Sequence, residues 1–413
     1  MGFRYLDGHL HCDGVSLQET VSLAGTPFYC YSGDAIRENF ERYRRNFPAD
    51  RAMVCFAVKA NSNQSVLQLL GACGAGADVV SGGELKRALA AGIPADRVVF
   101  SGVAKTEAEM VFALEQGIFQ FNVESEPELE RLDEIARSLG TVAPAAFRVN
   151  PDIDAGTHEK ITTGKAVNKF GIPMSRAGDV YRRAARMTGI RVQGIAMHIG
   201  SQLTDLEPFR KAFGCLAELA RGLLADGHDI SVLDIGGGLG IDYRDGAPVP
   251  PSLEDYAESA RNALGPLGCR IVVEPGRSIV GEAGVLVSEV LYVKEGEGVR
   301  FAIIDAGMND LMRPSLYGAY HEISPLVQSD GPLVTYDVVG PICETGDTFL
   351  RGVELPELKP GDLVAFRNAG AYGAVMSGTY NTRPLVPEIM VRDGAARLIR
   401  RRVTPDEIIA LDL

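Results

Sequence analysis

The chain has 413 residues, 46% of them apolar. It can therefore bury a full hydrophobic core and divide into two domains, because single cores stop growing at roughly 250–300 residues. Its net charge of −13 argues against nucleic acid as a partner, and its seven scattered cysteines without a C-x-x-C pair argue against disulfides and structural zinc. We expect a cytoplasmic protein with no membrane span and no export signal.

From about Phe28 onward, short β-rich runs alternate with longer stretches of helical period, which is typical of βα units around a parallel sheet. Helices are predicted over residues such as 83–91, 107–116, 126–139, 207–224 and 253–264. Eight strands with eight crossovers predict an α/β fold with a closed (β/α)8 barrel, although an open doubly wound sheet has the same local pattern. The predicted strands end in the segments 54–58, 77–80, 98–100, 119–122, 146–149, 194–197, 232–235 and 271–273.

After Arg277 the pattern changes to strand-like runs broken by Gly, Pro and acidic turns, with little helical period. Residues 1–30 have a similar strand- and turn-like character. The sequence therefore predicts a barrel domain over residues 31–280 and a second, mainly β domain formed by residues 1–30 and 281–413. The strand-like runs of the second domain lie at 285–293, 300–304, 333–339 and 363–366.

Polar residues or glycines lie at or just beyond the end of each predicted barrel strand. Loops after the carboxyl ends of the strands build the active site in barrels of this kind. We therefore expect these side chains to face one site. They are Lys59, Asp78, Ser101, Asn122, Arg148, His198, the run Gly236–Gly238, and Glu274.

Lys59, at the end of the first strand, could condense as a neutral amine with an aldehyde, although a lone lysine there is more often a solvated surface charge. The glycines of residues 236–240 let backbone N–H groups approach an anion closely, in the region where barrels commonly bind phosphate. One or two glycines would satisfy a tight turn, so the run of three favours a phosphate site.

Glu274 would matter if the ligand were a pyridine, because an ionised carboxylate keeps the ring nitrogen protonated and the ring electron-withdrawing. The alternative is an ordinary capping carboxylate paired with Arg277. His198 could stack on a planar ring, with Ser201 offering its hydroxyl to the same ligand, or could be a hydrogen-bonded core histidine.

The second domain carries two further segments in turn-like contexts, residues 340–345 and 369–373. They would present Cys343, Glu344 and Tyr372 to a cleft. A free cysteine is usually buried and inert, whereas an exposed Cys343 beside Glu344 would suit a proton donor.

Taken together, these motifs resemble those of the bacterial diaminopimelate decarboxylases almost from end to end. The resemblance implies the barrel class of pyridoxal-phosphate-dependent decarboxylases, and the conversion of meso-2,6-diaminopimelate to L-lysine with loss of the carboxylate at the D centre. The segments that carry it are 57–61, 76–84, 198–202, 236–240, 274–277, 308–314, 343–346 and 371–373.

The resemblance also implies a role for individual residues. Lys59 matches the Schiff-base lysine, Glu274 the partner of the pyridine nitrogen, and His198 the ring-stacking residue. Asp78 is included in the cofactor site, Ser201 matches a cofactor contact, and the phosphate neighbourhood is matched by Gly237, Gly238, Gly276, Arg277 and Tyr372. Cys343 matches the proton donor, and the residues that hold the distal end of the substrate are matched by Arg277, Arg313, Tyr317, Glu344 and Tyr372. In the family, Cys343 and Glu344 reach the site from the other subunit of a homodimer.

Three other functions stay open at this point. A metal-dependent barrel hydrolase would fit His9-Leu10-His11, but further ligands at strand ends are missing, and we expect no metal. A non-catalytic relative that only binds the cofactor has no need of Cys343 with Glu344. Within the decarboxylases, the alternative substrate is another diamino acid or a carboxylated polyamine.

Overall fold

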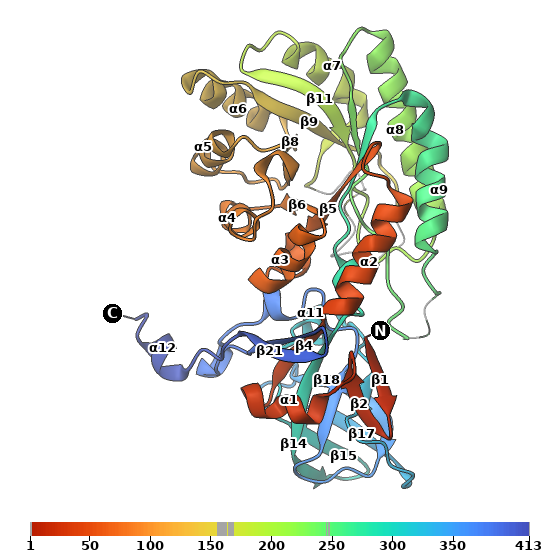
Figure 1. Cartoon of the computed structure of the whole chain (residues 1–413), viewed down its shortest axis with the longest axis vertical. Coiled ribbons are helices and arrows are strands. Elements are labelled where there is room, and N and C mark those ends of the chain that lie inside the picture. The colour runs from red at the N-terminus through yellow and green to blue at the C-terminus, as the bar shows by residue number, and fades with distance from the viewer. Residues whose placement is uncertain (1, 155–162, 164–168, 245, 247, 413) are drawn as a thin grey trace. The chain divides into compact units, whose positions relative to one another are not determined.

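The computed structural model describes residues 2–154, 163, 169–244, 246 and 248–412 (Figure 1). The chain divides into two compact units, which we call the barrel unit and the β unit. The barrel unit comprises Phe40–Ile241 and Pro248–Ser278, and the β unit comprises Met1–Asn39, Asp242–Ala247 and Ile279–Leu413. Within the described ranges, no helix is both long and apolar enough to cross a membrane.

The barrel unit contains a closed parallel sheet of eight strands, which confirms the predicted (β/α)8 fold. The sheet is closed because β8 pairs with β9, which joins the last strand of the ring to the first. A two-residue strand, β10 (Ile172–Pro173), also pairs with β9. The eight strands are β5 (Ala52–Ala57), β6 (Gly76–Val79), β7 (Val98–Phe100), β8 (Gln120–Val123), β9 (Ala143–Asn150), β11 (Ile190–Ala196), β12 (Val232–Asp234) and β13 (Arg270–Val273).

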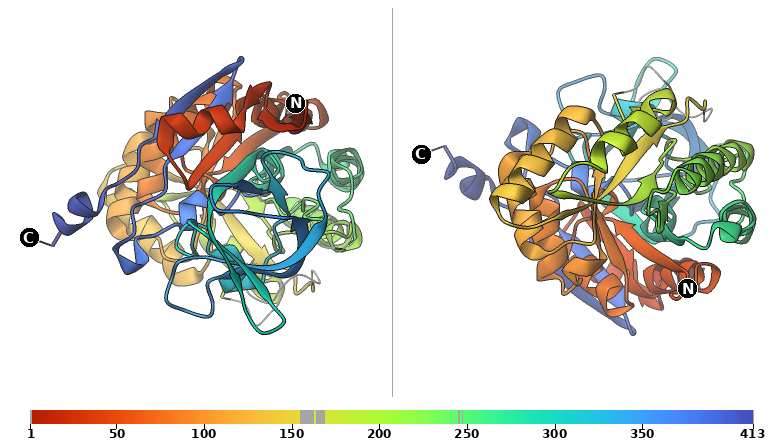
Figure 2. Two further views of the ribbon diagram at one scale, coloured as in Figure 1. Left: turned by 90° about the horizontal axis from the view of Figure 1, so that it is seen from below. Right: turned by 90° about the horizontal axis from the view of Figure 1, so that it is seen from above.

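Helices lie outside this ring of strands (Figure 2). Their ends follow local signals: α5 begins at Thr106, whose side chain forms a capping box with Glu109, and it ends at Gly117 in the left-handed conformation. The helices of the barrel unit are α3 (Gln64–Ala72), α4 (Gly82–Ala90), α5 (Glu107–Gln116), α6 (Glu126–Ser138), α7 (Met174–Ala184), α8 (Glu207–Ala225) and α9 (Leu253–Leu264), and residues of α2 (Gly33–Asn46) belong to both units.

Strand alternation determines which side chains enter the barrel. A buried apolar cluster contains Val99, Val232 and Val272, which come from β7, β12 and β13. Because side chains alternate with a period of two along a strand, the residues two positions later point to the same side, one layer nearer the carboxyl ends of the strands. Those later residues are Ser101, Asp234 and Glu274, and all three are buried. A polar layer therefore lies directly above the apolar core.

The β unit consists mainly of β-strands, and its larger sheet is mixed: most neighbouring strands pair antiparallel, whereas β15 pairs with β17, and β20 with β4, in parallel. A three-stranded sheet joins β1 (Phe3–Leu6), β2 (His9–Cys12) and β3 (Val15–Ser16), and the larger sheet runs in the order β18-β17-β15-β14-β4-β20-β21, with β19 paired to both β14 and β16. The larger sheet contains β4 (Phe28–Ser32), β14 (Gly284–Glu295), β15 (Arg300–Ile304), β16 (Ile323–Pro325), β17 (Leu333–Val339), β18 (Thr348–Pro356), β19 (Leu363–Phe366), β20 (Glu388–Arg392) and β21 (Ala395–Arg400).

The first strand of this larger sheet comes from the N-terminal part of the chain. β4 lies between β14 and β20, where Cys30 is opposite both Val285 and Ile389. These three residues belong to one buried apolar cluster with Leu10 and Leu17. The N-terminal segment is therefore part of the core of the β unit. Four short helices complete the chain: α1 (Leu17–Ala24), α10 (Arg277–Val280), α11 (Arg313–Tyr317) and α12 (Pro405–Ile409).

Candidate active site

A cavity of about 180 Å³ opens at the carboxyl ends of the barrel strands. Residues from each of the eight barrel strands, or from the segments directly after them, line its wall. The structure thus brings together most of the strand-end residues that the sequence singled out. The chemically active lining residues are Lys59, Ser101, Asn122, Arg148, His198, Asp234 and Glu274.

Lys59 lies in a short 3-10 helix, Val58–Ala60, directly after β5, and its side chain is 37% exposed. Its Nζ is hydrogen-bonded to Oδ2 of the fully buried Asp78 on the neighbouring strand β6. The register places Asp78 opposite Ala57, which explains why the two groups meet. The other oxygen, Oδ1 of Asp78, is buried and has no hydrogen-bond partner among the described residues.

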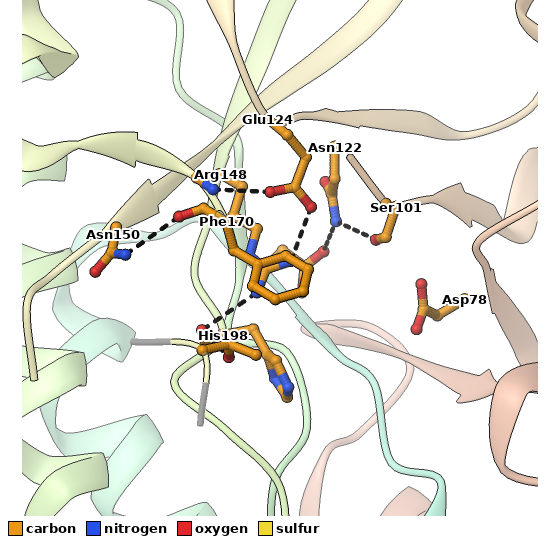
Figure 3. Close-up of polar contacts among 12 residues, drawn as sticks. Asp78, Ser101, Asn122, Glu124, Arg148, Asn150, Phe170 and His198 are labelled. Carbon is orange, nitrogen blue, oxygen red and sulfur yellow. Dashed lines mark hydrogen bonds and ion pairs between the residues drawn. The ribbon is translucent and has the colours of Figure 1, made fainter. Parts of the chain in front are cut away.

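Four buried polar side chains meet in the wall of the cavity. Asn122 Nδ2 lies 2.9 Å from Asp234 Oδ2 and 3.4 Å from Glu274 Oε1. It also donates to Ser101 Oγ at 3.1 Å, as Figure 3 shows. The carboxyl groups of Asp234 and Glu274 are hydrogen-bonded to each other.

Burial changes the protonation of these two carboxyl groups. Removal from water, with the nearby charges of Asp234 and Asp78, raises the pKa of Glu274 well above its ordinary value. Burial also raises the pKa of Asp234, to about 6. Without a ligand, the carboxyl group of Glu274 therefore holds a proton more tightly than an ordinary glutamate does; the ionised carboxylate that the sequence led us to expect applies to a site with a ring nitrogen beside it. A protonated carboxyl group is a hydrogen-bond donor.

His198, just after β11, is held through both its ring and its backbone. Its Nδ1 lies 3.3 Å from the backbone nitrogen of Gly237, an N–H donor, and its carbonyl accepts a hydrogen bond of 3.0 Å from Thr163 Oγ1. Burial lowers the pKa of His198 well below its usual range, and the cations of Arg148 and Lys59 lower it further. The imidazole is therefore neutral, with its proton on Nε2.

Arg148, on β9, connects His198 to a second buried carboxylate. One guanidinium nitrogen lies 2.8 Å from Glu124 Oε1, and another lies 3.5 Å from the carbonyl oxygen of His198. Glu124 Oε2 accepts a hydrogen bond of 2.9 Å from the backbone of Gly171. The guanidinium also lies over the ring of Phe170, 4.8 Å from its centroid (Figure 3). Arg148 is thus fixed from three sides at the wall of the cavity.

The glycine run after β12 approaches the neighbouring backbone too closely for a side chain. A Cβ on Gly237 would lie 2.2 Å from the carbonyl oxygen of Glu274, and Gly238 has a φ of +111°. Gly276, in the loop after β13, packs against Ala57 and Ala60 in the same way. Nearby, Nη2 of Arg277 donates to Ser201 Oγ at 3.2 Å. Backbone N–H groups, a hydroxyl and a guanidinium therefore surround this end of the barrel.

The remaining predicted site residues belong to the β unit. Cys343 and Glu344 are exposed in the loop between β17 and β18, where Tyr380 donates to Glu344 Oε2 at 3.3 Å. Arg313 and Tyr317 are the first and last residues of α11. Tyr372 follows β19 with a φ of +56°.

Arg313 is buried and held on two sides within the β unit. Its Nη1 lies 2.8 Å from His321 Nε2, and its guanidinium carbon lies 4.8 Å from the centroid of the Tyr243 ring. His321 in turn contacts the carbonyl oxygen of Arg367 through Nδ1. The orientation of Arg313 is thus fixed before any ligand arrives.

Reasoning from the sequence expected Asn122 to face the site but gave no role to Gln120 on β8 or to Glu124 just after it. Gln120, Asn122 and Glu124 alternate with Phe121 and Val123, so all three polar side chains share one side of the strand. Polar residues at alternate positions of a strand that is buried on both faces are uncommon. That alternation is the signal that could have identified them. Among the described residues, no group of three or more His, Cys, Asp or Glu side chains could hold a metal ion.

Comparisons with known proteins agree with this geometry. The family described as "Pyridoxal-dependent decarboxylase, pyridoxal binding domain" matches residues 33–281. The chain is 47% identical to the diaminopimelate decarboxylase of Zymomonas mobilis, over 98% of this chain and 97% of that protein, and 48% identical to that of Pseudomonas aeruginosa, over 99% and 98%.

Solved structures extend the likeness to the whole fold. The diaminopimelate decarboxylase of Helicobacter pylori, complexed with L-lysine, superposes with a TM-score of 0.92 at 44% identity, covering 96% of this chain and 98% of that one. The enzyme of M. jannaschii, also in complex with L-lysine, superposes with a TM-score of 0.95 at 36% identity, covering 100% and 98%.

Proposed function

The chain belongs to the diaminopimelate decarboxylases, within the pyridoxal-dependent decarboxylases, and from that premise we propose that it converts meso-2,6-diaminopimelate to L-lysine and carbon dioxide. This reaction is the last step of lysine biosynthesis. One observation carries the proposal: Lys59 and Glu274, a carboxyl group whose pKa burial raises, line the same cavity at the carboxyl ends of the barrel strands. An amine that can bind an aldehyde thus shares a pocket with an acid that can serve a ring nitrogen.

The residues of this cavity fit pyridoxal 5'-phosphate as the cofactor. Oδ1 of Asp78 is a buried acceptor with no hydrogen-bond partner among the described residues, and Gly237 has no room for a Cβ. Lys59 would bind the aldehyde carbon, His198 would stack on the ring, and Ser201, Gly238, Gly276 and Arg277 would surround the phosphate, with Tyr372 as a further contact. The bound cofactor would supply an electron sink for the pair released from the Cα–carboxylate bond.

The first test of this cofactor site is chemical. Borohydride reduction of the protein saturated with pyridoxal phosphate, followed by peptide mass mapping, should attach the cofactor to Lys59. Attachment to another lysine would contradict the assignment.

In the proposed reaction each group of the chain has a separate task. Glu274 holds a proton on its carboxyl group for the ring nitrogen, while the neutral His198 adds no positive charge beside the ring. Arg277, Arg313 and Tyr317 bind the distal carboxylate of the substrate, and Glu344 binds the distal ammonium. Cys343 then delivers a proton from its thiol to the carbon that lost carbon dioxide.

We also propose a homodimer in which Cys343 and Glu344 serve the cavity of the partner subunit. Their exposure on a loop of the β unit supports this arrangement, because an exposed thiol can reach a second chain. We further propose a cytoplasmic location, supported by the seven cysteines, which form no disulfide in the part of the chain that the structure describes.

A carbon-dioxide release assay tests the proposed reaction. Purified protein with pyridoxal phosphate should release carbon dioxide from meso-diaminopimelate far faster than from L-lysine, L-ornithine or L-arginine, and Lys59→Ala should be inactive. Equal or faster release from one of the other three amino acids would favour the alternative, a decarboxylase of another diamino acid. Release from carboxylated polyamines would be measured in parallel.

A further inference from the structure

Asn122 occupies a position that connects one side of the barrel with the other. It lies on β8, whereas Asp234 and Glu274 lie at the ends of β12 and β13. The strand order separates β8 from β13 by β5, β6 and β7. The amide of Asn122 therefore spans the barrel interior to reach the two carboxyl groups.

The orientation of this amide is fixed by its own neighbours. Gln120 Nε2 donates to Asn122 Oδ1 at 2.8 Å, so the Nδ2 group must point toward the acids. The backbone is held as well, because the buried Lys105 donates to the carbonyl oxygen of Asn122 at 2.7 Å and forms an ion pair of 2.6 Å with Glu128. Asn122 is thus a fixed donor rather than an adaptable one.

The hydrogen bonds of the two acids are unequal. Asp234 accepts one N–H from Asn122 at 2.9 Å and a second from the backbone of Gly236, also at 2.9 Å. The contact from Asn122 to Glu274 is longer, at 3.4 Å. Because N–H donors favour the ionised form of a carboxyl group, Asp234 is the carboxylate of the pair and Glu274 keeps the proton.

We infer that Asn122 is a positioning residue for the reaction: by donating at shorter range to Asp234 than to Glu274 it keeps the shared proton on Glu274, and its longer contact aims that carboxyl group at the cofactor ring nitrogen. The inference rests on the proposed function, because it needs a cofactor with a basic ring nitrogen. With a cofactor bound, Glu274 would give up the proton of its O–H bond to the ring nitrogen and would remain as the carboxylate beside it.

The experiment compares two ligands that differ at one atom. They are pyridoxal phosphate and its 1-deaza analogue, in which a carbon replaces the ring nitrogen. The dissociation constant of each is measured with the full chain freed of cofactor and without substrate. Wild-type protein should prefer pyridoxal phosphate by roughly ten- to a hundredfold, the effect of one charged hydrogen bond.

Variants at residue 122 and at a control position separate positioning from general damage. Asn122→Ala should reduce this preference to about threefold or less, since the proton is no longer held on Glu274. Asn122→Ser should keep part of the preference, because its hydroxyl can donate to one acid only. Asn46→Ala is the control: Asn46 donates to the carbonyl oxygen of Arg42 at 3.0 Å within α2, takes no part in the hydrogen bonds of Asn122 described above, and should keep the wild-type preference.

Each outcome decides the question. If Asn122→Ala keeps the full preference, or if Asn46→Ala loses it equally, the positioning role of Asn122 is wrong. If Asn122→Ala does not fold, Asn122→Ser decides instead, and a full wild-type preference in Asn122→Ser would show that the positioning role is wrong. If wild-type protein does not distinguish the two ligands, the role proposed for Glu274 fails first, and the inference about Asn122 fails with it.

Discussion

Lys59 and Asp78 form an ion pair at the ends of the neighbouring strands β5 and β6, in which the Nζ of Lys59 donates to Oδ2 of Asp78. The other carboxyl oxygen of Asp78, Oδ1, has no hydrogen-bond partner among the described residues. Because Asp78 is fully buried, its charge is balanced by a group that the proposed reaction also needs for the cofactor. Stability and cofactor binding are therefore coupled at this pair.

Lys59→Ala should destabilise the cofactor-free protein, because it leaves a buried carboxylate without a cation. We expect a loss of about 1–3 kcal/mol in the free energy of unfolding, below the range for fully buried pairs, since water reaches Lys59. The loss is measured by unfolding the protein in urea and monitoring the transition by circular dichroism. The double variant Lys59→Ala/Asp78→Asn should regain most of the loss, and an equally unstable double variant would contradict this account.

Glu274→Gln should change how the stability of the cofactor-free protein depends on pH. The folded-state pKa of Glu274 is raised above its ordinary value of 4.5. Its contribution to the free energy of unfolding is therefore fully present below pH 4.5 and is lost as the pH rises through the folded-state pKa. Glutamine does not titrate. The melting temperature of the variant should therefore improve relative to wild type between pH 4.5 and pH 8. Parallel curves over this range would show that Glu274 is not protonated.

Mixing two inactive proteins should restore activity if the sites are shared. Lys59→Ala lacks the cofactor lysine and Cys343→Ala lacks the proposed proton donor, yet one site of each mixed dimer would be intact. Random exchange of subunits should recover about a quarter of wild-type activity. Each variant incubated alone is the control. Absence of recovery after exchange has been verified by mass spectrometry would mean that each chain completes its own site.

Arg313→Ala should lose kcat/KM for meso-diaminopimelate by on the order of 10²–10⁴-fold, because the distal carboxylate loses a fixed guanidinium partner. Arg313→Lys should recover only part, since an ammonium group lacks the two-pronged geometry. The control is Arg351→Ala, which removes an exposed arginine of the same unit that pairs with Asp337. Its kcat/KM should be nearly that of the wild type. A kcat/KM for Arg313→Ala equal to that of the control would rule out the assignment.

Much of the barrel could be predicted because its signals are local. Apolar runs that end in Lys59, Asp78 or Glu274 indicate strands with a polar mouth, and Thr106 with Glu109 marks a helix start. The bounds predicted for α5 and α9 agree with the structure.

The connections across the barrel could not be predicted. Whether Asn122 meets Asp234 depends on the closure and stagger of eight strands, which no local pattern encodes. The raised pKa of Glu274 could not be predicted for a related reason. Its pKa depends on burial beside Asp234 and Asp78, which are far from it in the sequence.

The pairing of β5 with β13 has a consequence for how the protein is made. Ala52 on the first barrel strand lies opposite Ile271 on the last, so the ring cannot close until the ribosome has released both. At roughly 5–20 residues per second, the first strand waits on the order of 10–40 seconds for its neighbour. During this interval the nascent chain exposes an apolar strand edge, and Glu274 has yet to be synthesised. We therefore expect the cofactor to join the protein only after most of the chain has left the ribosome.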